Sequence, residues 1–224
     1  MEKIIYSSTG GALYGNPETV PCQDDAPVEP VSPYGMSKYV AEQYLEFYHR
    51  QFRLIYTTLR YGNVYGPRQD PTGEAGVVAI FSQAMLDGKQ PEIFGDGNQE
   101  RDFTYVEDIV DGCLLAAEKP INDGTPINLG TGTRFKIKEV VDMIFEILNW
   151  KPKEFVFETD KPVGVLSRAL DNSKAKQLLG WEPKFTLKDG LAKTVEWYVN
   201  THKSAGKIKD DLLLEHQHNK QSRI

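Results

Sequence analysis

The sequence predicts an α/β fold in which a helix connects two buried, parallel strands. Three observations support this prediction. Residues 3–7 form an apolar run that ends in a cluster of hydroxyl and glycine residues, a pattern typical of a buried strand followed by a loop. Residues 34–48 carry apolar side chains at helical spacing, and residues 54–60 are rich in β-branched and aromatic side chains. Because strands joined by a helix pair in parallel through a right-handed crossover, these segments predict one strand–helix–strand unit.

The remaining elements are justified by local signals. Pro33 suits the first turn of the connecting helix, and the proline-rich, acidic segment 16–33 before it is expected to be a surface loop. Residues 61–76 are rich in Gly, Pro and Asp, which predicts a second loop. The helix expected at 77–87 ends at Gly88. Later strands are expected at 92–94, 102–106, 126–129 and 155–157, and later helices at 106–118, 137–148, 173–179 and 187–199.

The composition is that of an ordinary globular protein. Of the 224 residues, 40% are hydrophobic and 26% are charged, with a formal net charge of −6. An acidic chain matches the phosphate backbone of nucleic acids poorly, so no nucleic-acid partner is expected. The longest apolar run, residues 77–81, is too short to cross a bilayer, and residues 1–5 lack the features of a signal peptide. Cys22 and Cys113 follow no disulfide or metal-ligand pattern. These features predict a reduced, cytoplasmic protein without a membrane segment or a metal.

Tyr34 and Lys38 stand four residues apart in the segment 32–38. On a helix, this spacing places both side chains on one face. A phenol with a pKa near ~10 is a poor base at neutral pH, but a neighbouring ammonium favours the phenolate and so assists proton transfer. The same spacing is common on ordinary helix faces, so it does not identify a catalytic pair by itself.

Ser7, Ser8 and Thr9 lie at the end of the first predicted strand, and Gly10 and Gly11 come next. Doubly wound sheets present ligand contacts at the carboxyl ends of their strands, although a plain turn has the same composition. The two glycines are expected to open no helix. In combination with the Tyr-x-x-x-Lys helix and the second strand, the hydroxyl cluster predicts an active site.

With these motifs in place, the chain resembles the NAD-dependent epimerase/dehydratase family of extended short-chain dehydrogenases/reductases. The likeness is carried in order by segments 6–15, 32–38, 59–68, 73–81, 93–97, 101–109, 128–132, 171–175 and 179–183. It implies the carboxyl-terminal part of a doubly wound Rossmann domain and a small α/β substrate-binding domain. Residues 1–66 would be the partial NAD-binding domain. Residues 67–200 would be mainly the substrate domain, with short returns to the Rossmann sheet, and 201–224 a polar tail.

The resemblance also implies a catalytic centre. Tyr34 would be the base on the sugar 4-hydroxyl, and Lys38 would hold the nicotinamide ribose and assist Tyr34. Thr9, or alternatively Ser8, would hydrogen-bond the same hydroxyl. Two residues are given because this sequence has one more glycine after Thr9 than the family's pattern. When the family's spacing is counted back from Tyr14, the matching position is therefore shifted by one residue.

The cofactor implied by the resemblance is NAD. Its expected contacts are Ser7, Tyr34, Lys38 and Tyr61, of which Tyr61 would approach the nicotinamide. A tyrosine at this place is also compatible with a packed aromatic side chain.

The implied substrate is a nucleotide sugar, expected to be a UDP-hexose. Asn63 and Arg101 would hold its diphosphate, and a guanidinium fork suits that task. Plainer readings are a turn residue for Asn63 and a surface arginine paired with Asp102 for Arg101. The complete set of expected contacts is Asn63, Gly76, Val77, Phe94, Arg101, Lys161 and Arg168.

Gly76, Val77 and Phe94 would line the uridine site, where Phe94 also fits a place in the core. The segment 161–164 departs from the family's Arg-Pro-Gly-Asp/Glu pattern, because Lys161 replaces the arginine and the acidic residue is missing. Lys161 still offers a charge to phosphate, and Arg168 is a possible substitute. This departure leaves the nucleotide and the sugar open.

The residues after Thr9 bear on the reaction. Relatives that eliminate water place a carboxylate there, but residues 10–12 are Gly, Gly and Ala. Cys22 is expected in a surface loop and Cys113 within a helix, so neither matches the cysteine that relatives epimerising C3 and C5 use. The sequence thus favours a nucleotide-sugar 4-epimerase of the UDP-glucose/UDP-galactose type that oxidises C4 transiently with NAD. A 4,6-dehydratase or a reductase of the same family remains an alternative.

The family's Gly-x-x-Gly-x-x-Gly loop, which binds the cofactor pyrophosphate at a helix start, does not occur in this sequence. By the resemblance, an amino-terminal part of the Rossmann domain is expected to be missing, and strand 3–7 would keep an unpaired edge. A non-catalytic remnant that binds substrate and dimerises is therefore a second hypothesis. A homodimer through the Tyr-x-x-x-Lys helix is expected in either case.

Overall fold

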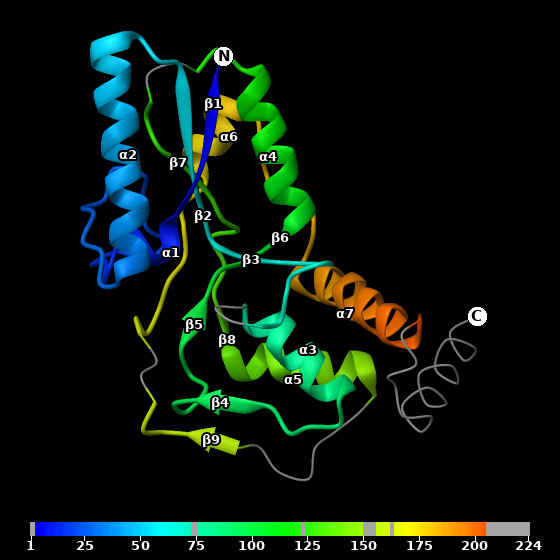
Figure 1. Ribbon diagram of the computed structural model, residues 1–224. Coiled ribbons are helices and arrows are strands. Elements are labelled where there is room, and N and C mark those ends of the chain that lie inside the picture. Colours follow the sequence, from blue (N-terminus) through cyan, green and yellow to red (C-terminus); the bar gives the residue numbers. More distant parts are fainter. Residues whose placement is uncertain (1–2, 73–75, 122–123, 150–155, 162–163, 205–224) are drawn as a thin grey trace. The chain divides into compact units, whose positions relative to one another are not determined.

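The computed structural model describes residues 3–72, 76–121, 124–149, 156–161 and 164–204 (Figure 1). The chain divides into two compact units, each built from three separate stretches. Unit 1 comprises Met1–Val64, Glu100–Phe135 and Val165–Phe185, and unit 2 comprises Tyr65–Gln99, Lys136–Gly164 and Thr186–Ile224. The roles expected for residues 1–66 and 67–200 stay predictions, and the expected tail lies outside the described residues beyond Ser204.

A three-stranded parallel sheet forms the centre of unit 1. Its strands run in the order β1 (Ile4–Thr9), β2 (Tyr56–Tyr61) and β7 (Ile127–Leu129). Thr9 pairs with Tyr61, so β1 and β2 end level with each other. Among the described residues, β1 is an edge strand. The expected pair of parallel strands joined by a helix is confirmed.

Two long helices pack on opposite faces of this sheet (Figure 1). They are α2 (Pro33–Phe52) and α4 (Val106–Glu118). Successive side chains of a strand point to opposite faces: Ser8 contacts α2, whereas Ser7 contacts Tyr61, which in turn contacts α4. The end of β1 therefore presents one hydroxyl to each side of the sheet.

The hydrophobic core of unit 1 packs α4 and α6 (Ser173–Leu179) against β2 and β7. Trp181 is 2% exposed, and its indole nitrogen donates to the carbonyl of Asp108 at 2.7 Å. Gly180 ends α6, as expected, with a φ of 71°. The core side chains are Leu59, Ile109, Ala116, Ile127, Leu129, Ala175, Leu179 and Trp181.

Two expectations near β1 were wrong. Gly10–Leu13 form a one-turn helix, α1, where no helix was expected. Gly10 packs closely there, because a Cβ would lie 2.5 Å from the end of the Leu170 side chain. Cys22 is not at the surface: it is 2% exposed and forms a β-bridge with Leu170.

The expected loop 61–76 was also partly wrong, because Asn63–Tyr65 form the short strand β3. This strand pairs with β6 (Phe103–Tyr105). A second short pair, β5 (Glu100–Arg101) with β8 (Phe135–Lys136), was not predicted. Strands of two residues have no measurable hydrophobic period, so only their tertiary pairing defines β5 and β8.

Unit 2 is built on three helices that pack against each other: α3 (Val77–Leu86), α5 (Ile137–Leu148) and α7 (Leu187–Ser204). The strands β4 (Glu92–Phe94) and β9 (Val156–Glu158) form a short parallel pair. The strand expected at 155–157 is thus found from residue 156 on, and residue 155 lies outside the described part. Buried side chains of the three helices include Val78, Phe81, Met85, Val140, Ile144, Leu148, Leu191 and Val195.

Across the described stretches, no helix combines the length and apolar character that a membrane span requires.

Candidate active site

Tyr34 and Lys38 lie one turn apart on α2, beside the carboxyl end of β1. The ammonium nitrogen of Lys38 donates to the carbonyl oxygen of Ser7 at 3.0 Å. The same nitrogen lies 5.9 Å from the centre of the Tyr34 ring and 5.5 Å from the centre of the Tyr6 ring. Tyr34 is 47% exposed, so its phenol is open to a ligand. The structure therefore brings the two candidate residues together at a strand end.

The start of α2 fixes where Tyr34 lies. The hydroxyl oxygen of Ser32 accepts a hydrogen bond from the Gly35 N–H at 3.1 Å, and Pro33 occupies the first turn. Gly35 is buried, and a Cβ there would lie 2.5 Å from the carbonyl oxygen of Ala12. Only glycine permits this close approach of α2 to α1, which explains the glycine that follows Tyr34.

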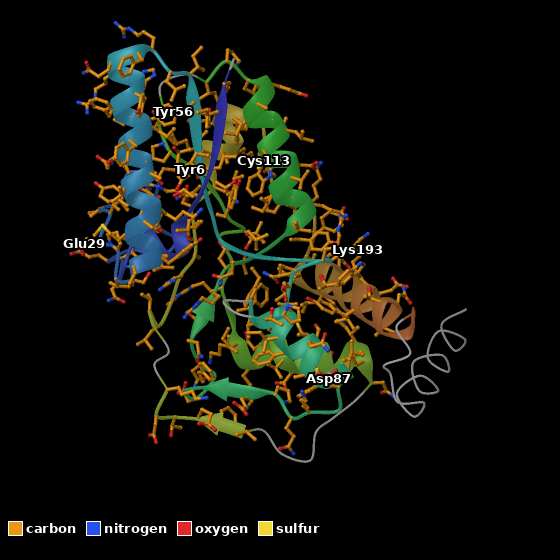
Figure 2. All side chains as sticks on the ribbon, viewed as in Figure 1. Tyr6, Glu29, Tyr56, Asp87, Cys113 and Lys193 are labelled. Carbon is orange, nitrogen blue, oxygen red and sulfur yellow. The ribbon has the colours of Figure 1, made fainter. Side chains whose placement is uncertain are left out.

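Tyr61 ends β2 and links Ser7 to α4. Its hydroxyl oxygen lies 2.9 Å from Ser7 Oγ and 3.1 Å from Cys113 Sγ. Cys113 lies on α4 (Figure 2). Burial, reinforced by the hydrogen bond with Cys113, raises the pKa of Tyr61, so its hydroxyl stays protonated at neutral pH. Cys113 lies within a helix, as expected, but its contact with a candidate NAD residue was missed.

Thr9, Asn63 and Arg168 converge around Gly11. A Cβ on Gly11 would lie 3.6 Å from Arg168 Nη1, 3.8 Å from Asn63 Oδ1 and 3.9 Å from Thr9 Oγ1. A guanidinium, an amide oxygen and a hydroxyl thus surround one point at the end of β1. These groups combine hydrogen-bond donors and acceptors, which suits a polar ligand.

Arg168 and Arg101 make this side of unit 1 electropositive. Nε of Arg168 is buried and has no hydrogen-bond partner among the described residues. Burial, and then the nearby charge of Arg101, lowers the pKa of Arg168 to about 10. Burial also lowers the pKa of Arg101. A bound anion would relieve the cost of placing two cations together.

Ser8 lies on the other face of β1 and is 3% exposed. Its hydroxyl donates to Oε1 of Glu42 at 2.5 Å. Glu42 also accepts from Nε of Arg60 at 3.1 Å and from Nη2 of Arg60 at 2.6 Å. Burial alone would lower the pKa of Arg60, but the hydrogen bonds and charge of Glu42 raise it overall. The Ser8 hydroxyl is therefore committed to a buried ion pair.

Tyr14 and Asn128 extend this buried network. Nη1 of Arg60 donates to the Tyr14 hydroxyl oxygen at 2.9 Å, and that hydroxyl donates to Oδ1 of Asn128 at 2.8 Å. The backbone N–H of Asn128 donates to Oδ1 of Asp24 at 2.6 Å. Burial raises the pKa of Tyr14 to about 12, so its hydroxyl remains a donor at neutral pH.

Sequence reasoning missed Glu42 and Arg60. Two signals pointed to them. Glu42 follows Tyr34 and Lys38 at the same four-residue spacing, and Arg60 is a charged residue inside a strand that reads as buried.

The other candidate residues, Gly76, Val77, Phe94 and Lys161, belong to unit 2. The ammonium nitrogen of Lys161 lies 4.5 Å from the centre of the Phe94 ring and 3.7 Å from Oε2 of Glu92. Phe94 is 46% exposed and is therefore not a core residue in this chain. Gly76 is the N-cap of α3 and Val77 is its first residue. The structure groups Phe94 with Lys161.

Within the described residues, no group of three or more His, Cys, Asp or Glu side chains is arranged to hold a metal ion.

Comparison with known proteins gives consistent matches. The profile of the NAD dependent epimerase/dehydratase family matches residues 1–130. A putative UDP-glucose 4-epimerase of Methanocaldococcus jannaschii is 41% identical over 204 residues, which are 91% of this chain and 65% of that protein. The crystal structure of a UDP-glucose 4-epimerase from Thermotoga maritima, with UDP-glucose, is 47% identical with a TM-score of 0.85; the match covers 90% of this chain and 64% of that one.

The structure of the Thermus thermophilus UDP-glucose 4-epimerase with NAD is 36% identical with a TM-score of 0.80, over 88% of this chain and 64% of that one. More distant relatives have other activities. A dTDP-4-dehydro-6-deoxyglucose reductase of Escherichia coli is 32% identical over 87% of this chain and 61% of that protein. The chain thus spans slightly less than two thirds of the length of the relatives it matches. The structural matches confirm the predicted Rossmann-type α/β fold class.

Proposed function

Because this chain belongs to the NAD dependent epimerase/dehydratase family, we propose that the protein carrying it is a nucleotide-sugar 4-epimerase of the UDP-glucose/UDP-galactose type. One observation carries the proposal: Lys38 is bonded to the end of β1 and lies beside the exposed phenol of Tyr34. The 4-epimerase names of the relatives at 41% and 47% identity support the choice of reaction.

The groups at the ends of β1 and β2 suit the nicotinamide half of NAD. Lys38 would hold the ribose hydroxyls together with Tyr34, and Ser7 and Tyr61 would flank the nicotinamide. Ser7 is exposed, and Lys38 and Tyr61 are partly exposed, so these groups are accessible to a ligand. When bound, NAD supplies the hydride acceptor and donor that the reaction requires. These residues account for the nicotinamide end alone.

Proton transfer falls to Tyr34. Its side-chain oxygen would take the proton of the sugar 4-hydroxyl, while bound NAD would supply the acceptor for the hydrogen on C4, so that a 4-keto sugar results. After the sugar had turned over and C4 had been reduced on its opposite face, Tyr34 would give the proton back to the oxygen. The atoms balance, because neither hydrogen is lost from the site.

Thr9 is our choice for the second contact with the 4-hydroxyl. This choice is supported by the different contacts that Ser8 and Thr9 make. Ser8 is buried and donates to Glu42, whereas Thr9 Oγ1 lies at the point near Gly11 that Asn63 and Arg168 also approach.

Asn63, Arg101 and Arg168 would bind the substrate diphosphate. Two partly buried guanidiniums near each other form a strong phosphate site, and the unpartnered Nε of Arg168 offers it a donor. Arg168 would thus make the phosphate contact that the family's pattern assigns to an arginine at position 161. Gly76, Val77 and Phe94 would line the nucleoside site, with Lys161 held against the Phe94 ring.

We also propose a homodimer formed through α2. A row of large apolar side chains on this helix is exposed, each by 42% or more, and such rows mark protein interfaces. They are Met36, Val40, Tyr44, Phe47, Tyr48 and Phe52.

The function is tested by incubating the intact protein that carries this chain with UDP-glucose and NAD and following the sugar by NMR. The expected product is UDP-galactose, without net consumption of NAD. A 4-keto-6-deoxy sugar would instead assign a dehydratase. Binding of UDP-glucose without any product would favour the non-catalytic alternative.

A further inference from the structure

Helix α2 carries the candidate catalytic pair but has a weak apolar anchor on the sheet. Its large exposed side chains include Tyr44 at 62% and Phe52 at 68%. Along the whole helix, the buried residues are Gly35 and Glu42. An apolar face turned away from the sheet cannot determine how the helix is rotated on it. Apart from half-buried side chains such as Ala41 and Leu45, the rotation of α2 therefore depends on close backbone packing and on polar contacts.

Glu42 is the buried polar contact. It follows Tyr34 and Lys38 at four-residue spacing, so the three side chains project from the same face of the helix. Its carboxylate accepts two hydrogen bonds from Arg60, on β2, and one from Ser8, on β1. One side chain thus ties α2 to both strands whose ends form the candidate site.

Arg60 is held in place from its other side. Its Nη1 donates to the Tyr14 hydroxyl at 2.9 Å and to the carbonyl oxygen of Asp24 at 3.2 Å. Arg60 is 4% exposed and Glu42 is 7% exposed. Because both partners are buried and the guanidinium is bonded on both sides, the pair cannot follow a rotation of α2 without breaking several bonds at once.

A buried ion pair is a poor means of stabilising a fold, since desolvation of the charges offsets their attraction. It is a good means of specifying one arrangement over another. We propose that Glu42 is a positioning residue: its bonds to Arg60 and Ser8 set the rotation of α2 and thereby hold Tyr34 and Lys38 at the ends of β1 and β2. The catalytic consequence rests on the proposed function, while the effect on the helix does not.

Glu42→Gln tests the proposal, because it keeps the size of the side chain and removes its charge. In the intact protein, we expect kcat to fall about 10- to 100-fold while KM for UDP-glucose stays within about 2-fold. KM is expected to change less than kcat because Arg101 and Arg168, the proposed diphosphate contacts, lie outside α2. The control is Glu118→Gln, the same substitution at an exposed position on α4. The control should leave both constants unchanged.

A second variant separates positioning from stability. Glu42→Met combined with Arg60→Met replaces the ion pair by apolar side chains, which should return the melting temperature toward that of the wild type. If Glu42 positions α2, kcat stays low in this double variant. If kcat recovers together with the melting temperature, the pair is only structural and the proposal is wrong.

Amide hydrogen exchange gives a readout that needs no turnover. In Glu42→Gln, amides of residues 37–41 should exchange faster, while those of α4 should keep the wild-type rate. Unchanged exchange in α2 together with unchanged kcat overturns the proposal. A wild-type protein that shows no epimerisation overturns the proposed function instead, and the exchange result still decides the role of Glu42. If Glu42→Gln does not fold, Ser8→Ala removes one of the three bonds and should move kcat and exchange in the same directions by about 2- to 5-fold.

Discussion

Ser7 and Ser8 are neighbours on β1, yet they belong to two different regions of unit 1. Ser7 is exposed, lies within hydrogen-bonding distance of the Tyr61 hydroxyl and offers its carbonyl to Lys38. Ser8 is 3% exposed and donates to Glu42, which is paired with the buried Arg60. The alternation of side chains along a strand separates the two regions by a single residue.

This difference shows that the end of β1 contributes both to an accessible candidate site and to a buried polar network. Around Ser7 and Tyr34, the polar groups are accessible and can exchange present partners for a ligand. Around Ser8 and Glu42, the polar groups are buried and bonded to one another, so a change there disturbs the arrangement of helix and sheet. Substitutions on the accessible side should therefore alter chemistry or binding without altering stability. Substitutions on the buried side should alter stability and, through the position of α2, the turnover rate.

Tyr34→Phe is expected to have the largest effect. Loss of the proposed base should lower kcat by about 10²- to 10⁴-fold, while the unfolding free energy stays unchanged because the side chain is 47% exposed. Steady-state kinetics and urea denaturation measure the two quantities. Tyr44→Phe, 62% exposed on the same helix, is the control. Near-normal turnover of Tyr34→Phe would remove Tyr34 from the mechanism.

Arg168→Gln should weaken binding of UDP-glucose by roughly 10- to 100-fold, the range for hydrogen bonds to charged groups. The turnover rate at saturating substrate should change much less, because the contact is remote from C4. Calorimetric titration measures the affinity. Arg134→Gln is a matched control in the same unit, since Arg134 is engaged with Glu100. Equal affinities of wild type and Arg168→Gln would place the diphosphate elsewhere. Arg101→Ala should behave like Arg168→Gln.

Tyr14→Phe tests the buried side. The change leaves Oδ1 of Asn128 without its donor and Nη1 of Arg60 without one acceptor. Loss of such bonds should lower the unfolding free energy by about 1–3 kcal/mol, measured by urea denaturation. Affinity for UDP-glucose should stay unchanged. A weakened affinity with unchanged stability would reverse the assignment of the two regions.

The pH dependence of binding should show the smallest effect. The pKa of Arg168 is lowered to about 10, so its charge is present below that pH and is lost as the pH rises through it. Affinity for UDP-glucose should therefore be level between about pH 7.5 and 9 and fall above that range. In Arg168→Gln the fall should be shallower. Parallel curves for the two proteins would show that another group titrates.

Much of the fold followed from local signals. The helix at 106–118 and the helix at 137–148 were predicted to the residue because apolar spacing defines both. Gly180, with a φ of 71°, stops the helix at 173–179 where the sequence placed its end. The strand β3 was missed because it lies in a segment rich in Gly, Pro and Asp that predicts a loop, and β5 and β8 were missed because two residues carry no period and their pairing is long-range.

The candidate site likewise contains contacts that the sequence predicted and contacts that it did not. The proximity of Tyr34 and Lys38 follows from four-residue spacing on a helix, which is a local property. The pairing of Glu42 with Arg60 joins residues 18 positions apart through the packing of α2 on the sheet. The contact of Cys113 with Tyr61 joins residues 52 positions apart. The sequence alone does not show that the residues of these pairs are close in space. A charged residue in a buried strand does, however, indicate that it requires a partner.

The hydrogen on sugar C4 gives the most direct test of the account. UDP-glucose deuterated at C4 is incubated in ordinary water with the intact protein and NAD, and the product is analysed by NMR and mass spectrometry. The account predicts UDP-galactose that retains the deuterium at C4, and no such product with Tyr34→Phe. A product with solvent hydrogen at C4, or a dehydrated 4-keto sugar, would contradict it.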